Sequence, residues 1–403
     1  MKPIVFTGLL LVCLLSNSCA PVQGFDAHLQ SIVKSHLFSI ARWESTAIAH
    51  EMNQWLFGRH EETADETSAV TEYFSSTERI RTLKSKIEAA NSGNSESEKA
   101  SLEAELIGLE EQKIASEETV ERIIEKQIRN VLAQQGIFNP IVESEVSFPP
   151  VNFELERLPH LLVVSPRDRI DSIREITLEP SLILEEIEDI EARADELGVS
   201  SLVVELGGFA TYPTLVANEA SLRTTLDTTA EEWLHQYLMF KPLGFLYLLD
   251  LTGLSRNYEI ATMNETLAGM VSKEIGSMVY EKYYSEYENG ADQDQVSESE
   301  FDFNGEMREI RRAVDIYLAQ GQIEQAEEFM EEKRQYLVSM GYYIRKLNQA
   351  YFAFHGTYAD KPAFISPIGI DLQELRNKSA SLKDFLNTVA AMTSQQDLRE
   401  SIK

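Results

Sequence analysis

The chain has almost no cysteine. Its 403 residues include only Cys13 and Cys19, and both lie within the first twenty positions. A disulfide framework in the body of the protein is therefore excluded, as is a metal site built from thiolates. Any metal ion would have to be held by histidine and carboxylate side chains, and the sequence has only seven histidines.

Basic residues are also scarce. The 36 lysines and arginines stand against 66 aspartates and glutamates, which gives a formal net charge of −30. A surface of this charge repels phosphate backbones, so we expect no nucleic-acid partner. Hydrophobic residues make up 43% of the chain and charged residues 25%, a composition typical of a globular protein.

The N-terminus has the layout of an export signal in residues 1–19. Lys2 precedes an apolar run at 4–15, and the small and polar residues SNSCAPVQG follow. The run is shorter than the roughly 20 residues of a membrane span. Cys19 resembles the acceptor cysteine of bacterial lipoprotein signals, although Leu15 lies one position further away than usual. A lipid anchor at Cys19, plain secretion and an uncleaved anchor are the alternatives. Each predicts an exported chain, at the outer face of the membrane or in the periplasm.

Residues 20–137 have the pattern of a helical arm. The segment 26–60 has apolar residues at three- and four-residue steps, and 70–135 predicts two helices joined by the turn NSGNS at 91–95. Charged residues fill the remaining positions of the pair, as in a solvent-exposed coiled coil. We expect a spacer or arm; a lid over the next domain and a dimer contact, which would make the chain an oligomer, are the alternatives.

A proline-rich break at 138–153 predicts a domain boundary, with a second domain over 138–403. HLLVVSP at 160–166 and SSLVVEL at 200–206 are typical of buried strands, and 181–198 predicts a helix that ends at Gly198. The pattern is helical from Leu226 onward, apart from an acidic loop at 289–300. The expected fold class is α+β, with a helical coiled-coil arm, a small sheet and a mostly helical C-terminal part.

The segment TTAEEWLHQYL at 228–238 carries the strongest chemical signal. Zinc peptidases have the signature H-E-x-x-H on a helix, and Glu232 and His235 match its glutamate and its second histidine. Glu231 stands where the first histidine would be. Residues four apart share one helical face, so Glu231 and His235 can bind one ion, and a glutamate oxygen is able to bind zinc. Glu232 is displaced by about 100° around the helix, where its carboxylate can serve as a general base.

A third ligand follows thirty residues after His235, where Glu265 lies in MNETLAGMV. The pair EEWLHQYL and MNETLAGMV resembles the HExxHQ and NExxA motifs of gluzincin zinc peptidases. The segment 344–390 also resembles the C-terminal block of a family of bacterial aminopeptidases, which carries Leu-Asn-Asn-Ala, then Thr-Tyr, then Pro-Ala-Phe. The corresponding residues here are Leu347–Ala350, Thr357, Tyr358 and Pro362–Phe364. The three pieces span roughly 200–390.

This resemblance implies a zincin-like domain over 138–403 that hydrolyses a peptide or protein substrate. Glu231, His235 and Glu265 would hold a divalent metal, and Glu232 would activate water. The departure at Glu231 puts a second carboxylate on the ion, which lowers its Lewis acidity and adds manganese and iron(II) to zinc as candidates. The alternative is a catalytically inactive protein of the same fold that acts as a cell-surface binding or interaction module.

Two further interpretations of this helix remain. Glu232 and His235 also form Glu-x-x-His, the motif of di-iron bundles, but that architecture needs a second copy, which the sequence lacks. A charged helix face with His235 at the surface would carry no chemistry. His50-Glu51 in HEMNQ is a near miss to the zinc signature, since position 54 is glutamine.

Two sets of supporting residues are expected. Peptide hydrolysis needs a donor for the oxyanion, and a helix over 340–356 would place Asn348, Tyr351 and His355 on one face. Tyr351 and His355 are the candidate donors, with Tyr343 and Tyr358 as alternatives, and Asn348 is a candidate substrate contact.

Gly207 and Gly208 follow a predicted strand. The resemblance implies that an edge strand at this point pairs with the substrate backbone, and the two glycines would permit a close approach. A plain turn after the strand is the alternative.

Overall fold

The computed structural model describes residues 24–38, 65–90, 96–142, 144–252, 254–287, 301–356 and 367–403. Several predictions fall outside these residues: the apolar run, Cys19, His50, the turn at 91–95, the acidic loop, Thr357, Tyr358 and Pro362–Phe364. Within the described part, no helix combines the length and the apolar character needed to cross a membrane.

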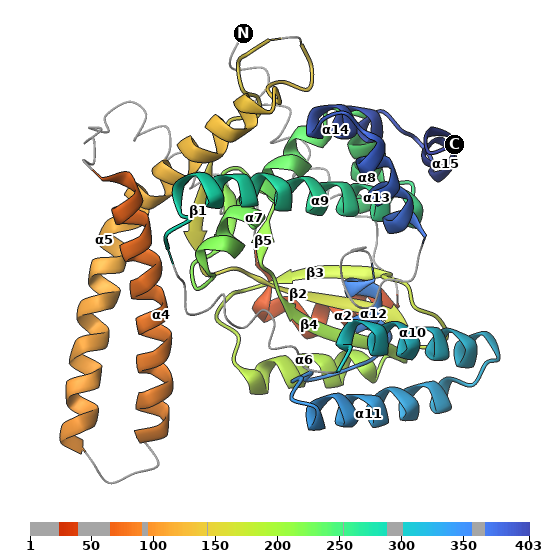
Figure 1. Cartoon of the computed structure of the whole chain (residues 1–403). Helices are drawn as coiled ribbons and strands as arrows, with labels where there is room; N and C mark the ends of the chain where they lie inside the picture. Colours follow the sequence, from red (N-terminus) through yellow and green to blue (C-terminus); the bar gives the residue numbers. More distant parts are fainter. Residues whose placement is uncertain are drawn as a thin grey trace.

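Two long helices form a hairpin that projects from the body of the molecule (Figure 1). They are α4 (Glu66–Ala90) and α5 (Glu96–Gln134). The helices run antiparallel, because Lys126 contacts Glu66 near the base and Arg79 contacts Glu105 further out. The two helices predicted over 70–135 are present.

The base of the hairpin belongs to the main hydrophobic core. Ile124 and Ile128 of α5 are buried in one cluster with residues of α7 (Leu222–Leu238) and α9 (Tyr258–Tyr283). Ile137 and Phe153, which flank the proline-rich segment, are buried in the same cluster. A single hydrophobic core therefore extends across the boundary predicted at 138.

The strands form two three-stranded sheets. One has the order β1 (Phe153–Glu156), β6 (Thr214–Ala217) and β5 (Gly208–Phe209), with β1 parallel and β5 antiparallel to β6. The other has the antiparallel order β3 (Arg174–Leu178), β2 (His160–Pro166) and β4 (Val199–Glu205). The strands predicted at 160–166 and 200–206 are confirmed, and so is the α+β fold class.

The helix before β4 ends as the sequence predicts. It is α6 (Leu184–Asp195), and its apolar side, with Ile190 and Ala194, packs against the β3–β2–β4 sheet. Gly198 follows with φ 81°, a left-handed conformation that glycine adopts without a steric penalty.

The N-terminal segment is not part of the arm, and the helix predicted over 26–60 is present only as far as Val33 in its described portion. α2 (Phe25–Val33) is followed by one 3-10 turn, η1 (Lys34–His36), and Leu37 then pairs with Leu178 of β3. The apolar stripe of α2 packs with the β3–β2–β4 sheet and α6. Periodicity correctly indicated an amphipathic helix, but it carries no information about its partner or its end.

The described residues from α7 onward are mostly helical, as predicted. The remaining helices are α8 (Pro242–Leu251), α10 (Phe303–Ala319), α11 (Ile323–Ser339), α12 (Gln349–His355), α13 (Ile368–Lys378), α14 (Leu382–Ala390) and α15 (Gln395–Ser401).

The helix expected over 340–356 is shorter than predicted. Gly341, with φ 94°, follows the end of α11, and α12 begins only at Gln349. Arg345 lies in the intervening segment, where it makes two hydrogen bonds of 2.9 and 2.6 Å to the carboxylate of Glu191 on α6. This ion pair, in which only Glu191 is buried, fixes the segment against the β3–β2–β4 sheet, so tertiary contacts override local helix propensity there.

Side chains of α5 accept hydrogen bonds from the backbone N–H groups on the outer edge of β1. Glu121 Oε1 accepts a hydrogen bond from Leu155 N at 2.6 Å, and Glu125 Oε1 accepts one from Phe153 N at 3.2 Å. Burial raises the pKa of Glu121 well above its ordinary value, and neighbouring carboxylates add to this, although the bond from Leu155 acts in the opposite direction. The helix α5 therefore covers the edge of β1 where a further strand could pair. Burial of the Glu121 carboxylate near other carboxylates makes this contact electrostatically unfavourable.

We expect Glu121→Gln to stabilise the protein at neutral pH, because glutamine keeps the acceptor and removes the buried charge. A carboxyl whose pKa is raised on folding contributes stability below its unfolded pKa, and loses it as pH rises through the folded value. The gain should therefore grow with pH, reaching on the order of 1 kcal/mol. Urea unfolding at pH 5, 6, 7 and 8 measures it. The exposed Glu118→Gln on the same helix is the control, and a gain independent of pH would contradict the prediction.

Candidate metal centre

Two helices position the candidate ligands. The Ser221 side chain caps α7 by accepting from Thr224 N, and the Asn257 side chain caps α9 by accepting from Glu259 N and Ile260 N. The buried apolar faces of both helices lie in the main core. The two helices therefore begin at defined residues and pack together, which fixes the side chains that they direct at each other.

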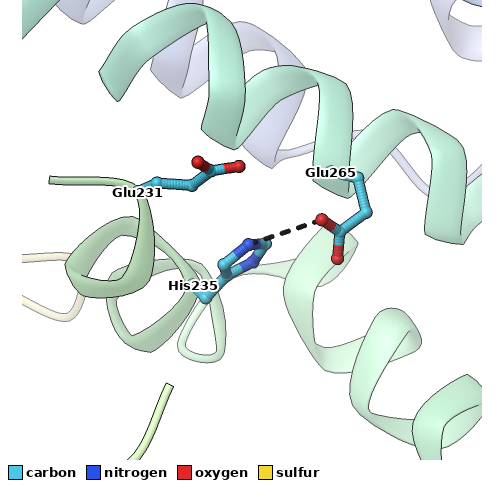
Figure 2. Close-up of side chains that lie close together, drawn as sticks. All are labelled: Glu231, His235 and Glu265. Atoms are coloured by element: carbon cyan, nitrogen blue, oxygen red, sulfur yellow. Dashed lines mark ion pairs between the residues drawn. The ribbon is translucent and has the colours of Figure 1, made fainter. Parts of the chain in front are cut away.

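Glu231 and His235 of α7 and Glu265 of α9 converge on one point. One potential ligand atom of each residue lies within 4.8 Å of those of the other two. Figure 2 shows the three side chains directed into a common space, with His235 Nε2 3.7 Å from Glu265 Oε2. Glu265 is 5% exposed, and the other two residues are half-buried. The three residues predicted as ligands are therefore brought together.

The oxygen of Glu265 that faces this point favours an ion. Glu265 Oε2 is buried and has no hydrogen-bond partner among the described residues. A buried carboxylate oxygen without a hydrogen bond is destabilising, and a bound cation would remove that penalty. Two carboxylates and an imidazole supply oxygen and nitrogen donors that suit zinc, manganese or iron(II). The residues present therefore fit a divalent metal ion.

Two further side chains contact the candidate ligands from outside. The hydroxyl of Tyr247, on α8, donates to Glu265 Oε1. The side-chain amide of Asn264 lies 3.0 Å from His235 Nδ1, and Nε2 is directed at Glu265. Nε2 can bind an ion only when Nδ1 carries the ring proton, so the amide oxygen of Asn264 would have to face the ring and accept that proton. Metal-binding histidines and carboxylates are commonly held by bonds of this kind.

Sequence reasoning did not identify Tyr247. It lies in PLGFLYLLDL, an apolar helix in which a tyrosine is expected to be a packing residue. A polar tip on an otherwise apolar helix, twelve residues after His235, is the only signal that could have identified it.

Glu232 lies beside the three candidate ligands and against β5. Burial, together with the charges of Glu231 and Glu265, raises the pKa of Glu232 well above its ordinary value. A Cβ atom at Gly208 would lie 2.6 Å from Glu232 Oε1 and 2.4 Å from Thr228 Cγ2, so any larger residue there would have to displace one of these side chains. β5 is an edge strand of its sheet. Of the two glycines singled out in the sequence, Gly208 thus contacts Glu232, whereas a Cβ at Gly207 meets no described atom within 4 Å.

The predicted residues of α12 have other partners. Asn348 accepts a bond from Tyr351 N as the N-cap of α12 and donates to Ser201 O of β4 at 2.8 Å. Tyr351 packs in the clusters around α10–α11 and β2–β4, and burial raises its pKa to about 12. The ring of His355 lies 4.3 Å from that of Tyr351 between centroids. The common helical face predicted for these three residues is wrong, because Asn348 precedes the first residue of α12.

None of these contacts connects Asn348 or Tyr351 to the candidate ligands within the part of the chain that the structure describes. Tyr343, the alternative donor in the described residues, is 91% exposed. In the described part of the chain, the tyrosine whose hydroxyl contacts a candidate ligand is therefore Tyr247, which lies on α8 and not on α12.

We expect Gly208→Ala to destabilise the protein by about 1–3 kcal/mol, because the added methyl group must displace Glu232 or Thr228. Gly207→Ala is the matched control, since its methyl group would point into open space and should change stability by less than about 0.5 kcal/mol. Urea unfolding of both variants measures the difference. Equal stabilities would show that β5 does not lie against Glu232.

Comparison with known proteins gives no relative for this chain. No protein-family model, no curated protein and no solved structure matches it. The interpretation of the site therefore depends on the residues of α7, α8 and α9 and on their geometry.

Proposed function

We propose that this protein is a metal-dependent peptidase of the gluzincin type. Its zincin-like domain would hold one divalent ion, and zinc is the preferred candidate over manganese or iron(II). The observation that carries this proposal is the convergence of Glu231, His235 and Glu265 within 4.8 Å. The order of these residues along α7 and α9 is the order in which gluzincins supply their ligands.

Glu232 is the proposed general base. A bound ion would supply Lewis acidity, polarising a peptide carbonyl and making water more acidic. Glu232 would take a proton from the attacking water and pass it to the leaving amine. A bound dication would offset the charges of Glu231 and Glu265, so burial is the cause that would keep the pKa of Glu232 raised. A raised pKa makes a carboxylate a stronger base.

The edge strand β5 is the proposed platform for the substrate. An extended peptide can add to a free strand edge, and Gly208 brings this strand into contact with Glu232. A peptide bound there would therefore run close to the proposed base. The same contact supports a peptide or protein as the substrate class.

The N-terminal residues support an extracytoplasmic location. An apolar run followed by Cys19 is the layout of an exported, lipid-anchored protein. The hairpin of α4 and α5 would then be an arm of an enzyme at the membrane surface, and an oligomer contact is one use for it.

Glu231 favours one second candidate. The extra carboxylate lowers the Lewis acidity of a bound ion, so a zincin-fold protein that binds partners without hydrolysis is the alternative. Metal binding without hydrolysis of any peptide in a mixed library would support this binding module.

Purified protein supplied with zinc should contain close to one ion per chain, because the ligand atoms already converge. His235→Ala and Glu265→Gln should lose most of this metal, since each removes one donor of three. Elemental analysis measures the content, and His36→Ala is the control because His36 contacts Glu179 instead. Absence of metal in the unmodified protein would rule out the proposal.

Glu232→Gln should lower peptide hydrolysis by about 10²–10⁴-fold while metal content stays unchanged, since glutamine cannot accept the proton. Turnover of a fluorogenic peptide library and elemental analysis together test this. Glu259→Gln, an exposed change on α9, is the control. Unchanged turnover in Glu232→Gln would refute the role of Glu232 without affecting the metal site.

A further inference from the structure

We infer that Tyr247 is a positioning residue that assigns different tasks to the two carboxylate oxygens of Glu265. This inference rests on the proposed metal site. The Tyr247 hydroxyl donates to Oε1 of Glu265. The other oxygen, Oε2, is buried without a described hydrogen-bond partner and lies 3.7 Å from His235 Nε2. One oxygen is therefore held by the protein, and the other is left for the ion.

The place of Tyr247 in the fold suits this role. Its ring is partly buried against the main hydrophobic core, which restricts the position of the hydroxyl. The same ring lies beside His235, with centroids 6.0 Å apart and planes inclined by 35°. Tyr247 thus contacts two of the three candidate ligands. A phenylalanine would provide the same packing, so the hydroxyl is what needs a further explanation.

A carboxylate with two free oxygens can bind an ion through one or both of them. A hydrogen bond to one oxygen removes that freedom, and bonds to charged acceptors in buried sites are strong. The hydroxyl also draws electron density away from Glu265. It therefore partly offsets the additional negative charge that Glu231 brings to a position where the zinc signature has a neutral histidine.

Tyr247→Phe tests the inference because it removes only the hydroxyl. We expect the affinity for Zn²⁺, measured by competition with a chelator, to fall by about 10–100-fold. We also expect the visible absorption of the Co²⁺-loaded variant to weaken, since ligation by the second Glu265 oxygen raises the coordination number. The spectrum is the readout that a merely structural role of Tyr247 would not change.

Tyr284→Phe is the matched control. Tyr284 is buried in the same core directly after α9, and its hydroxyl donates to Gln127 Oε1 at 2.5 Å. This variant therefore also loses one buried tyrosine hydrogen bond, but away from Glu265. Its Zn²⁺ affinity and its Co²⁺ spectrum should equal those of the unmodified protein.

The outcomes separate this inference from the proposed function. Unmodified protein that binds neither Zn²⁺ nor Co²⁺ would overturn both. Binding that is unchanged in Tyr247→Phe, or reduced equally in Tyr284→Phe, would overturn the role of Tyr247 and leave the metal site standing.

A second measurement tests the inference if the Tyr247→Phe variant does not fold. In Zn²⁺-loaded Glu231→His, Glu265 is the only carboxylate among the three proposed ligands. Infrared difference spectra should then show the wide separation of carboxylate stretches that ligation by one oxygen produces. A narrow separation would overturn the inference.

Discussion

The close approach of α7 and α9 is the constraint on which the site depends. At one point this approach depends on a glycine of α9, because a Cβ atom at Gly276 would lie 1.9 Å from Asp227 Oδ1. Gly269 lies two helical turns earlier on the same face of α9, where a Cβ atom would make ordinary contact, 3.7 Å from Glu231 Oε1. The same pairing of helices brings the potential ligand atoms of Glu231 and Glu265 within 4.8 Å of each other.

This packing concentrates negative charge in a part of the protein where little water can screen it. Glu231, Glu232 and Glu265 lie together, and the pKa of Glu232 is raised by burial and by the charges of the other two. Such an arrangement is unfavourable by itself, because buried charges of one sign repel each other and lose hydration. A divalent cation would remove most of the penalty. Other side chains around this point support the same residues: Tyr247 contacts Glu265, Asn264 contacts His235, and Gly208 leaves room for Glu232.

Local patterns in the sequence were enough for part of this structure. The strands at 160–166 and 200–206, the end of a helix at Gly198 and the shared face of Glu231 and His235 all follow from spacing and composition. Glu265 was selected by resemblance, and the fold brings it to the same point. The failures involve contacts between distant segments. α2 packs on the β3–β2–β4 sheet, Arg345 is held by Glu191, and Tyr247 reaches Glu265 from an apolar helix. Periodicity shows which side of a helix is apolar, and it does not show which segment covers that side.

The glutamate at 231 is the point at which this site departs from the zinc signature, and its surroundings bear on the meaning of that change. A helix pair that served only as a core would be more stable with Glu265 replaced by an apolar or amide side chain, since this carboxylate is only 5% exposed and is buried at a penalty. Glu265 Oε2 is instead left without a described hydrogen-bond partner, and β5 has glycine where any side chain would displace Glu232 or Thr228. Sites where local stability is given up in this way are more often functional than structural. These features favour the proposal that Glu231 is an altered ligand of a bound ion.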